Sequence, residues 1–265
     1  MDLTVNGQPV YAHTGGRPFD PARPAIVLIH GAGMDHTVWS LQSRYLAHHG
    51  RSVLAVDLPG HGRSAGAPLA AIEDLADWIV ALLDAAGVAK AALAGHSMGA
   101  LVALETAARH GGRVESLALL GVAETMPVHP DLLAAAALND PSAIELVVGW
   151  GHGPCGHVGG AAAPGLSLVP GGRRLMQRAR PGVLGVDLGA CNAYVRGGEA
   201  AAAVSCPALF LLGGVDRMTP AKSGKALAAK VSGSEVVLLS GIGHMVMTEA
   251  PNATTDALAA RFSAR

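Results

Sequence analysis

Short apolar runs alternate with longer segments of helical periodicity along this 265-residue chain. The runs cover residues 24–30, 52–56, 91–94, 114–122, 208–212 and 236–239. Runs of this length without polar interruption are typical of strands buried on both faces. Between them, spacings such as Leu75, Ile79, Leu82 and Leu83 within 72–86 are those of amphipathic helices. The alternation predicts an α/β fold class, a mostly parallel central sheet with helices on both faces.

The two ends of the chain add smaller elements to this pattern. Residues 3–5 and 10–12 flank Asn6-Gly7, a dipeptide typical of tight hairpin turns. Further helices are expected at 39–49, 99–108, 221–231 and 252–262. For the helix at 221–231, Thr219 is predicted as N-cap and Pro220 as the first helical residue.

One long region interrupts the alternation. Between residues 124 and 204 there is no buried strand pattern, and short helices are predicted at 131–138, 140–148, 173–180 and 183–195. Nine glycines fall within 149–172, which predicts a mobile segment there. We therefore predict a core made of 1–123 and 205–265, and a helical cap made of 124–204 that covers the substrate site.

Polar residues follow the apolar runs with regularity. His30, Asp57, Ser97, Glu124, Asp216 and His244 each come just after one. The carboxyl ends of parallel strands meet at one edge of a sheet, where α/β proteins bind their ligands. The candidate chemistry is therefore expected at that edge.

The strongest local motif is Gly95-His96-Ser97-Met98-Gly99, which lies between an apolar run and a helical pattern. A serine on such a sharp strand-to-helix turn projects its hydroxyl beyond the sheet. The N–H of Met98, at the helix start, would face a developing oxyanion. A chance match is conceivable in a chain with 35 glycines, but the strand–turn–helix context favours Ser97 as a nucleophile.

A serine nucleophile requires a base, and the base requires an orienting acid. Among twelve histidines, His244 is favoured because it follows the last apolar run between flexible residues, in Gly241-Ile242-Gly243-His244-Met245. Asp216 follows the run at 208–212 and is the favoured acid. Glu124 follows the run at 114–122 and stays open as a substitute.

Taken together, the motifs HGAG at 30–33, DLPGHGRS at 57–64, GHSMG at 95–99, GGVDRMTP at 213–220 and GIGHMVMTEAP at 241–251 resemble the α/β-hydrolase superfamily. The resemblance covers nearly the whole chain and implies the catalytic order Ser97, Asp216, His244. It also implies an oxyanion hole formed by the backbone N–H groups of Ala32 and Met98, with Gly33 a less suitable donor. It implies no cofactor.

The same resemblance distinguishes this chain from other enzyme classes of the same fold. Haloalkane dehalogenases and epoxide hydrolases of this fold have an aspartate where this chain has Ser97. Hydrolases of carbon–carbon bonds usually have Asn before the serine and Trp after the histidine, whereas this chain has His96 and Met245. A carbon–carbon bond hydrolase therefore stays a second choice.

These features predict a serine hydrolase that cleaves a carboxylic ester of a small to medium acyl substrate. Thioester or lactone hydrolysis, acyl transfer and a non-catalytic ligand receptor of the same fold stay open. His30, Gly33, Trp150 and Tyr194 are expected at the substrate pocket, with packing in the core of the cap as an equal alternative for Trp150 and Tyr194. His152, Cys155 and His157 are of metal-ligating types, but a zinc site usually needs a further ligand, so no metal is expected.

Composition limits the partners. Charged residues make up 15% of the chain, the formal net charge is −1 and there is no basic tract, which argues against nucleic acid. No apolar run reaches the roughly 18 residues of a membrane span, and the first residues lack the pattern of a signal peptide. Three cysteines show no disulfide spacing. We expect a cytoplasmic monomer or homodimer acting on a small molecule.

Overall fold

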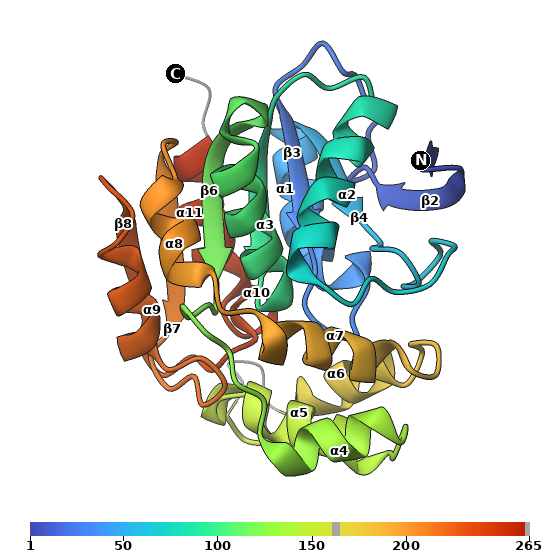
Figure 1. Cartoon of the computed structure of the whole chain (residues 1–265). Coiled ribbons are helices and arrows are strands. Elements are labelled where there is room, and N and C mark those ends of the chain that lie inside the picture. Colours follow the sequence, from blue (N-terminus) through green and yellow to red (C-terminus); the bar gives the residue numbers. More distant parts are fainter. Residues whose placement is uncertain (161–164, 263–265) are drawn as a thin grey trace.

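The computed structural model describes residues 1–160 and 165–262, and in it eight strands form one sheet (Figure 1). The strands are β1 (Asp2–Val5), β2 (Gln8–His13), β3 (Ala25–Ile29), β4 (Ser52–Val56), β5 (Ala91–His96), β6 (Val114–Leu120), β7 (Ala208–Gly213) and β8 (Glu235–Leu239). Their order across the sheet is β1-β2-β4-β3-β5-β6-β7-β8. Strands β3 to β8 are parallel, and β2 joins them antiparallel through β4.

The hairpin predicted at the start of the chain is confirmed. Strands β1 and β2 pair antiparallel, and Asn6 and Gly7 between them have φ of 49° and 76°. Such positive values suit the short twisted turns of hairpins. All six predicted parallel strands are also present, so the mostly parallel sheet is confirmed.

Alternate residues of each central strand face opposite layers of helices. Val27 and Ile29 pack in a core with α2 (Ile72–Ala85) and α3 (Met98–Arg109). Ile26 and Leu28 pack in a second core with α1 (Ser40–His48) and α11 (Pro251–Phe262). Both faces of the sheet are therefore buried, which explains why these strands are continuously apolar rather than alternating between apolar and polar residues.

The region without strands forms a group of helices at the carboxyl end of the sheet (Figure 1). It comprises α4 (Pro130–Ala137), α5 (Ser142–Gly151), α6 (Val169–Met176) and α7 (Val183–Ala193), and it has a small core of its own. A further helix, α8 (Gly197–Ala203), was not predicted separately and packs against α3 in the main core. Of the glycine-rich segment predicted to be mobile, residues 161–164 lie outside the described residues.

Two helices complete the C-terminal part, α9 (Ala221–Ala228) and α10 (Val246–Glu249). The residue that precedes α9 is Pro220, and no side chain caps the helix. The predicted N-cap role of Thr219 is therefore wrong, because its hydroxyl is bonded to Asp216 instead.

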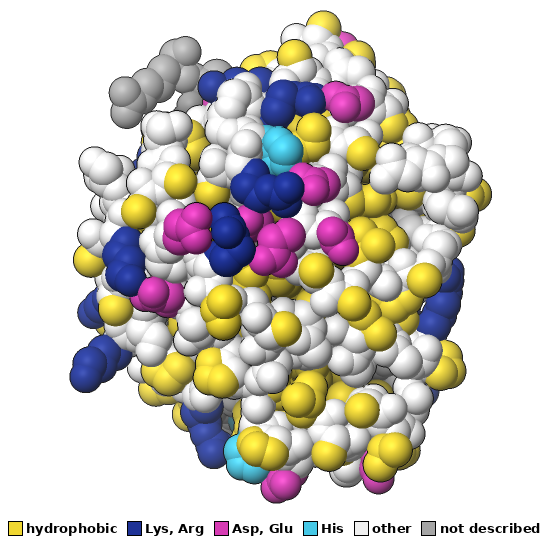
Figure 2. All heavy atoms as spheres, viewed as in Figure 1, with side chains coloured by type: hydrophobic (Ala, Val, Ile, Leu, Met, Phe, Trp, Pro, Cys, Tyr) yellow, Lys and Arg dark blue, Asp and Glu magenta, His cyan; other side chains and the backbone are white. Residues whose placement is uncertain are grey.

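The face shown in Figure 2 carries charges of both signs over the core, whereas the part occupied by the cap helices is mostly uncharged. Basic side chains of α3 and the turn that follows it are paired: Arg109 lies 3.0 Å from Asp77, and Arg113 lies 2.7 Å from Asp84. This face therefore presents no patch of a single sign. Among the described residues, no helix has the length and apolar character needed to cross a membrane.

Candidate active site

Ser97 occupies the turn between β5 and α3 in an unusual backbone conformation. Its φ is 54° and its ψ is −117°, a combination that a residue with a side chain adopts only at a cost. The flanking glycines make the turn possible: a Cβ at Gly95 would lie 2.0 Å from the carbonyl oxygen of Gly99, and one at Gly99 would lie 2.4 Å from that of Ile29. This is the geometry of a nucleophile elbow.

Asp216 and His244, from the loops after β7 and β8, are hydrogen-bonded to each other. Nδ1 of His244 lies 2.8 Å from Oδ2 of Asp216. The other carboxylate oxygen accepts the N–H groups of Met218 and Thr219 at 2.8 and 2.9 Å, and the Thr219 hydroxyl donates to Oδ2. Burial disfavours the ionised carboxyl, but His244 and Thr219 outweigh it and lower the pKa of Asp216 to about 2. An ionised Asp216 accepts from Nδ1–H and leaves Nε2 of His244 as the free base.

Ser97 and His244 line the same cavity. Nε2 of His244 is buried and has no hydrogen-bond partner among the described residues, so it is available to accept a proton. Glu124, the other candidate acid, is elsewhere: its carboxylate pairs with Lys230 at 2.6 Å on the surface. The contacts thus favour Asp216 over Glu124.

The loop that carries His244 is held by groups that the sequence did not reveal. The carboxylate of Glu249 accepts the N–H groups of Gly243, Met245 and Gly153, at 2.9 to 3.1 Å. In addition, the N–H of His244 donates to the carbonyl of Gly151 at the end of cap helix α5. The cap and the histidine loop are therefore fixed to each other.

His96 supports the same loop from the sheet. Its Nε2 lies 3.0 Å from the carbonyl oxygen of His244, which makes Nε2–H the donor. Burial, with a further contribution from His244, lowers the pKa of His96 to about 3. This neighbour of Ser97 is therefore uncharged, and its side chain supports the backbone of His244.

The loop at residues 30–33 lies directly against the elbow. A Cβ on Gly31 would come within 3.3 Å of Cβ of Ser97. His30 braces this loop: its Nδ1 lies 2.8 Å from the Gly31 carbonyl, and its Nε2 accepts the N–H of Leu58 at 3.2 Å. Burial and the nearby His61 lower the pKa of His30 to about 4, so it is the neutral acceptor that this arrangement needs.

The cavity beside Ser97 has a volume of about 350 Å³. Its walls come largely from the cap and are mostly apolar. They include Met34, Met126, Val128, Leu132, Val147, Val148, Trp150, Leu175, Met176, Leu184, Leu188 and Met218. Apart from Ser97, Thr219 and His244, the lining contains the polar side chains of His129, His152 and Arg217. Such a cavity suits an uncharged, apolar group.

Of the four residues expected at the pocket, only Trp150 is part of this lining. His30 lies behind the loop that it braces, and the N–H of Gly33 donates to Asp187. Tyr194 is buried, and its hydroxyl donates to Glu105 on α3 at 2.7 Å. For these three residues the expectation of a place in the pocket is corrected. Of the two expected oxyanion donors, Ala32 lines the cavity, while Met98 is fully buried at the first position of α3.

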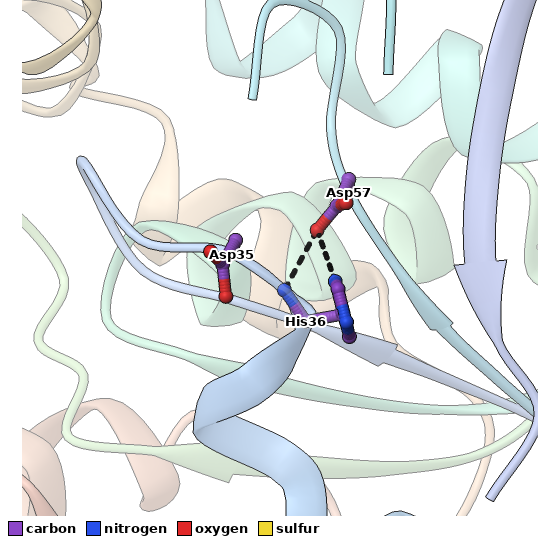
Figure 3. Close-up of side chains that lie close together, drawn as sticks. All are labelled: Asp35, His36 and Asp57. Atoms are coloured by element: carbon purple, nitrogen blue, oxygen red, sulfur yellow. Dashed lines mark hydrogen bonds and ion pairs between the residues drawn. The ribbon is translucent and has the colours of Figure 1, made fainter. Parts of the chain in front are cut away.

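Two of the three metal-ligating types in the cap, His152 and Cys155, are engaged in other contacts. Nδ1 of His152 donates to the carbonyl of Val148, and the Cys155 thiol donates to Glu249. Within residues 1–160 and 165–262, one cluster has the composition of a metal site, Asp35, His36 and Asp57 (Figure 3). There, His36 donates both its backbone N–H and its Nδ1–H to Asp57, while Asp35 accepts from Thr37 and Arg178. These oxygens hold a turn and a cap arginine.

The sheet topology, the serine elbow and the adjoining His–Asp pair are those of an α/β-hydrolase enzyme. The model of the "Alpha/beta hydrolase family" matches residues 26–257, and the chain belongs to this family. It is 31% identical over 235 residues to the pimeloyl-[acyl-carrier protein] methyl ester esterase of Neisseria meningitidis, covering 83% of this chain and 86% of the relative.

Two further similarities concern a part of the chain and the fold. Over 99 residues, 37% of the chain, it is 46% identical to the dihydrolipoyllysine-residue acetyltransferase component of the acetoin cleaving system of Pseudomonas putida, of which the match spans only 26%. The crystal structure of the enol-lactonase from Burkholderia xenovorans LB400 superposes with a TM-score of 0.86 over 100% of both chains, at 23% identity. The second similarity concerns the fold alone.

Proposed function

We propose that this enzyme is a serine hydrolase that cleaves a carboxylic ester through a Ser97–His244–Asp216 triad. The observation that carries the proposal is the meeting at one cavity of Ser97, on its strained elbow, and His244, whose buried Nε2 has no partner among the described residues. The similarity to a methyl ester esterase supports the ester as the bond that is cleaved.

In the proposed reaction, Oγ of Ser97 bonds to the ester carbonyl carbon while Nε2 of His244 accepts the hydroxyl proton. The carbonyl oxygen becomes an oxyanion that the N–H groups of Ala32 and Met98 stabilise, each such donor contributing about 3–4 kcal/mol in comparable sites. The alcohol then leaves with the proton from His244. Water attacks the acyl-enzyme in the same way, releases the acid and restores Ser97.

The proposed substrate has an uncharged, apolar acyl group of small to medium size. This follows from the apolar walls and the volume of about 350 Å³. We further propose that residues 124–204 act as a cap that selects the acyl group and supplies no member of the triad. Helix α8, which packs on α3, is the part of this region with the most contacts to the core.

The test combines a fluorophosphonate probe with nitrophenyl esters of increasing acyl length. Labelling and turnover are expected in the wild type, and both are expected to vanish in Ser97→Ala. Ser142→Ala, at an exposed cap position, is the matched control and should behave as the wild type. Tight ligand binding without turnover would indicate a receptor instead. Turnover confined to substrates with a cleavable carbon–carbon bond would indicate a carbon–carbon bond hydrolase.

A further inference from the structure

A buried carboxylate of the cap reaches into the core beside the proposed oxyanion hole. Asp187, on α7, is 1% exposed, and its Oδ2 accepts two hydrogen bonds. One comes from the backbone N–H of Gly33 at 2.8 Å, and the other involves Nε2 of His61 at 2.8 Å. Asp187 has no place in the triad, and burying a charge is costly unless it is paired. Its position therefore calls for an explanation.

The partner imidazole is set up to carry the opposite charge. Nδ1 of His61 lies 2.9 Å from the carbonyl oxygen of Pro59, so both ring nitrogens face acceptors and both must donate. Burial alone would lower the pKa of His61, but Asp187 outweighs it and the pKa is raised. The other titratable groups facing His61 are Asp57 and His30, whose ring lies 4.8 Å away. The result is a buried ion pair that spans the boundary between cap and core.

This ion pair decides which N–H groups of the loop at 30–33 remain available. The N–H of Gly33 is occupied by Asp187, whereas that of Ala32 donates to none of the described residues and Ala32 lines the cavity. Gly33 has a φ of 65°, and a Cβ there would meet Leu184 and Met176 of the cap at 3.0 and 3.1 Å. The cap therefore closes tightly on this glycine and fixes the peptide before it.

Two further contacts link the same part of the cap to the core without contacting Gly33. Arg178 donates to Asp35 at 2.6 Å, and Arg180 donates to the carbonyl of Ser64 at 2.8 Å. Arg178 is more than half exposed. These contacts anchor the cap, so they separate cap anchoring from any effect specific to the loop.

We propose that Asp187 is a positioning residue for the oxyanion hole: by binding Gly33 N–H together with protonated His61, it aims Ala32 N–H at the substrate. Cap docking and assembly of the oxyanion hole are then a single event. The proposal rests on the proposed hydrolase function. An oxyanion donor acts only at a fixed distance from the position that the oxyanion will occupy, so a small displacement of the peptide lowers the rate.

The first test compares two substitutions of similar size. Asp187→Asn keeps an oxygen that can accept from Gly33, whereas Asp187→Leu removes every acceptor. We expect Asp187→Leu to lower kcat about 100-fold with KM changed less than about threefold, because only a transition-state interaction is lost. A trifluoromethyl ketone, which Ser97 converts to a tetrahedral oxyanion, should bind weaker by the same factor. Asp187→Asn should recover most of both losses, and Arg178→Gln should behave as the wild type.

Three outcomes would overturn the proposal. In the first, Asp187→Leu is as active as the wild type. In the second, the ketone binds it unchanged. In the third, Arg178→Gln shows the same loss, which would make the effect one of cap anchoring. A wild type that is not labelled at Ser97 and hydrolyses no ester would instead refute the proposed function.

Amide hydrogen exchange in the unsubstituted protein covers the case in which Asp187→Leu does not fold. The proposal expects the Gly33 amide to exchange slowly, as a buried bonded N–H does. It expects the protection factor of Gly33, the exchange rate of an unstructured amide at the same pH relative to its own, to fall as the pH is raised far enough to deprotonate His61. Rapid exchange of Gly33 at every pH would mean that the bond to Asp187 is not maintained in solution, and would refute the proposal.

Discussion

The sheet edge and the cap reach the same cavity by different means. On the sheet side, the candidate catalytic residues Ser97, Asp216 and His244 follow strands, and Asp216 is held by its near neighbours Met218 and Thr219. On the cap side, contact with the site depends on a few bonds between residues far apart in sequence, such as Gly151 with His244 and Asp187 with Gly33. The candidate catalytic residues are therefore carried by loops of the sheet, whereas helices within 124–204 supply much of the cavity wall.

The largest expected effect lies on the sheet side. Ser97→Ala should lower kcat for ester hydrolysis by about 10⁵ to 10⁶, because the whole triad acts through this oxygen. Initial-rate assays with a chromogenic ester measure kcat, and circular dichroism checks that the variant is folded. A Ser97→Ala enzyme with more than a tenth of the wild-type kcat would remove the basis of the proposed mechanism.

The acid of the triad comes next. Asp216→Asn should lower kcat by about 10⁴, because the amide favours the wrong tautomer of His244. Glu124→Gln is the control, since Glu124 pairs with Lys230 on the surface, and it should leave kcat within about twofold. The reverse order of effects would transfer the acid role to Glu124.

Substitutions in the cap test the other side of the comparison and should change preference rather than chemistry. Trp150→Ala enlarges the cavity that Trp150 lines, so kcat/KM should shift toward longer acyl chains by about tenfold. Labelling of Ser97 should persist. Leu138→Ala changes a cap residue that is 79% exposed and should leave the profile unaltered. Complete loss of labelling in Trp150→Ala would mean that the cap takes part in the chemistry.

The smallest effect concerns stability and again separates the two regions. The pKa of His96 is lowered to about 3 in the folded protein. The stabilisation that neutral His96 gives the folded state is therefore complete above about pH 6.5, the usual pKa of histidine, and is lost as the pH falls toward 3. The free energy of unfolding should therefore fall by about 1–2 kcal/mol more between pH 6.5 and 5 in the wild type than in His96→Gln. Urea titrations measure it. In the cap, His157→Gln changes an exposed histidine, and the free energy of unfolding should fall between pH 6.5 and 5 by the same amount as in the wild type.

The placement of the candidate catalytic side chains could be predicted from the sequence because their signals are local. Apolar runs marked the strands, and Ser97, Asp216 and His244 each follow one. The placement of these three residues agrees with the expectation, although their roles await the experiments above. The fold was predictable for the same reason.

The rest depended on contacts that no local pattern carries. Asp187 and Gly33 are 154 positions apart, and Glu249 and Gly153 are 96 apart, so nothing near either residue signals the bond. Tyr194 was expected either at the pocket or in the core of the cap, and its hydroxyl donates to the buried carboxylate of Glu105 on α3. Which face a side chain presents is decided by tertiary packing, and local spacing does not encode it.

The Glu249 carboxylate has a consequence for the order in which the chain folds. It bonds N–H groups on both sides of His244 and also the N–H of Gly153, at the end of α5. During synthesis, α5 leaves the ribosome long before residue 249, so the bond between Gly153 and Glu249 can form only after residue 249 has emerged. Non-local pairings of this kind close late. A nascent chain that already carries Ser97 therefore lacks this support of the His244 loop until Glu249 has been synthesised.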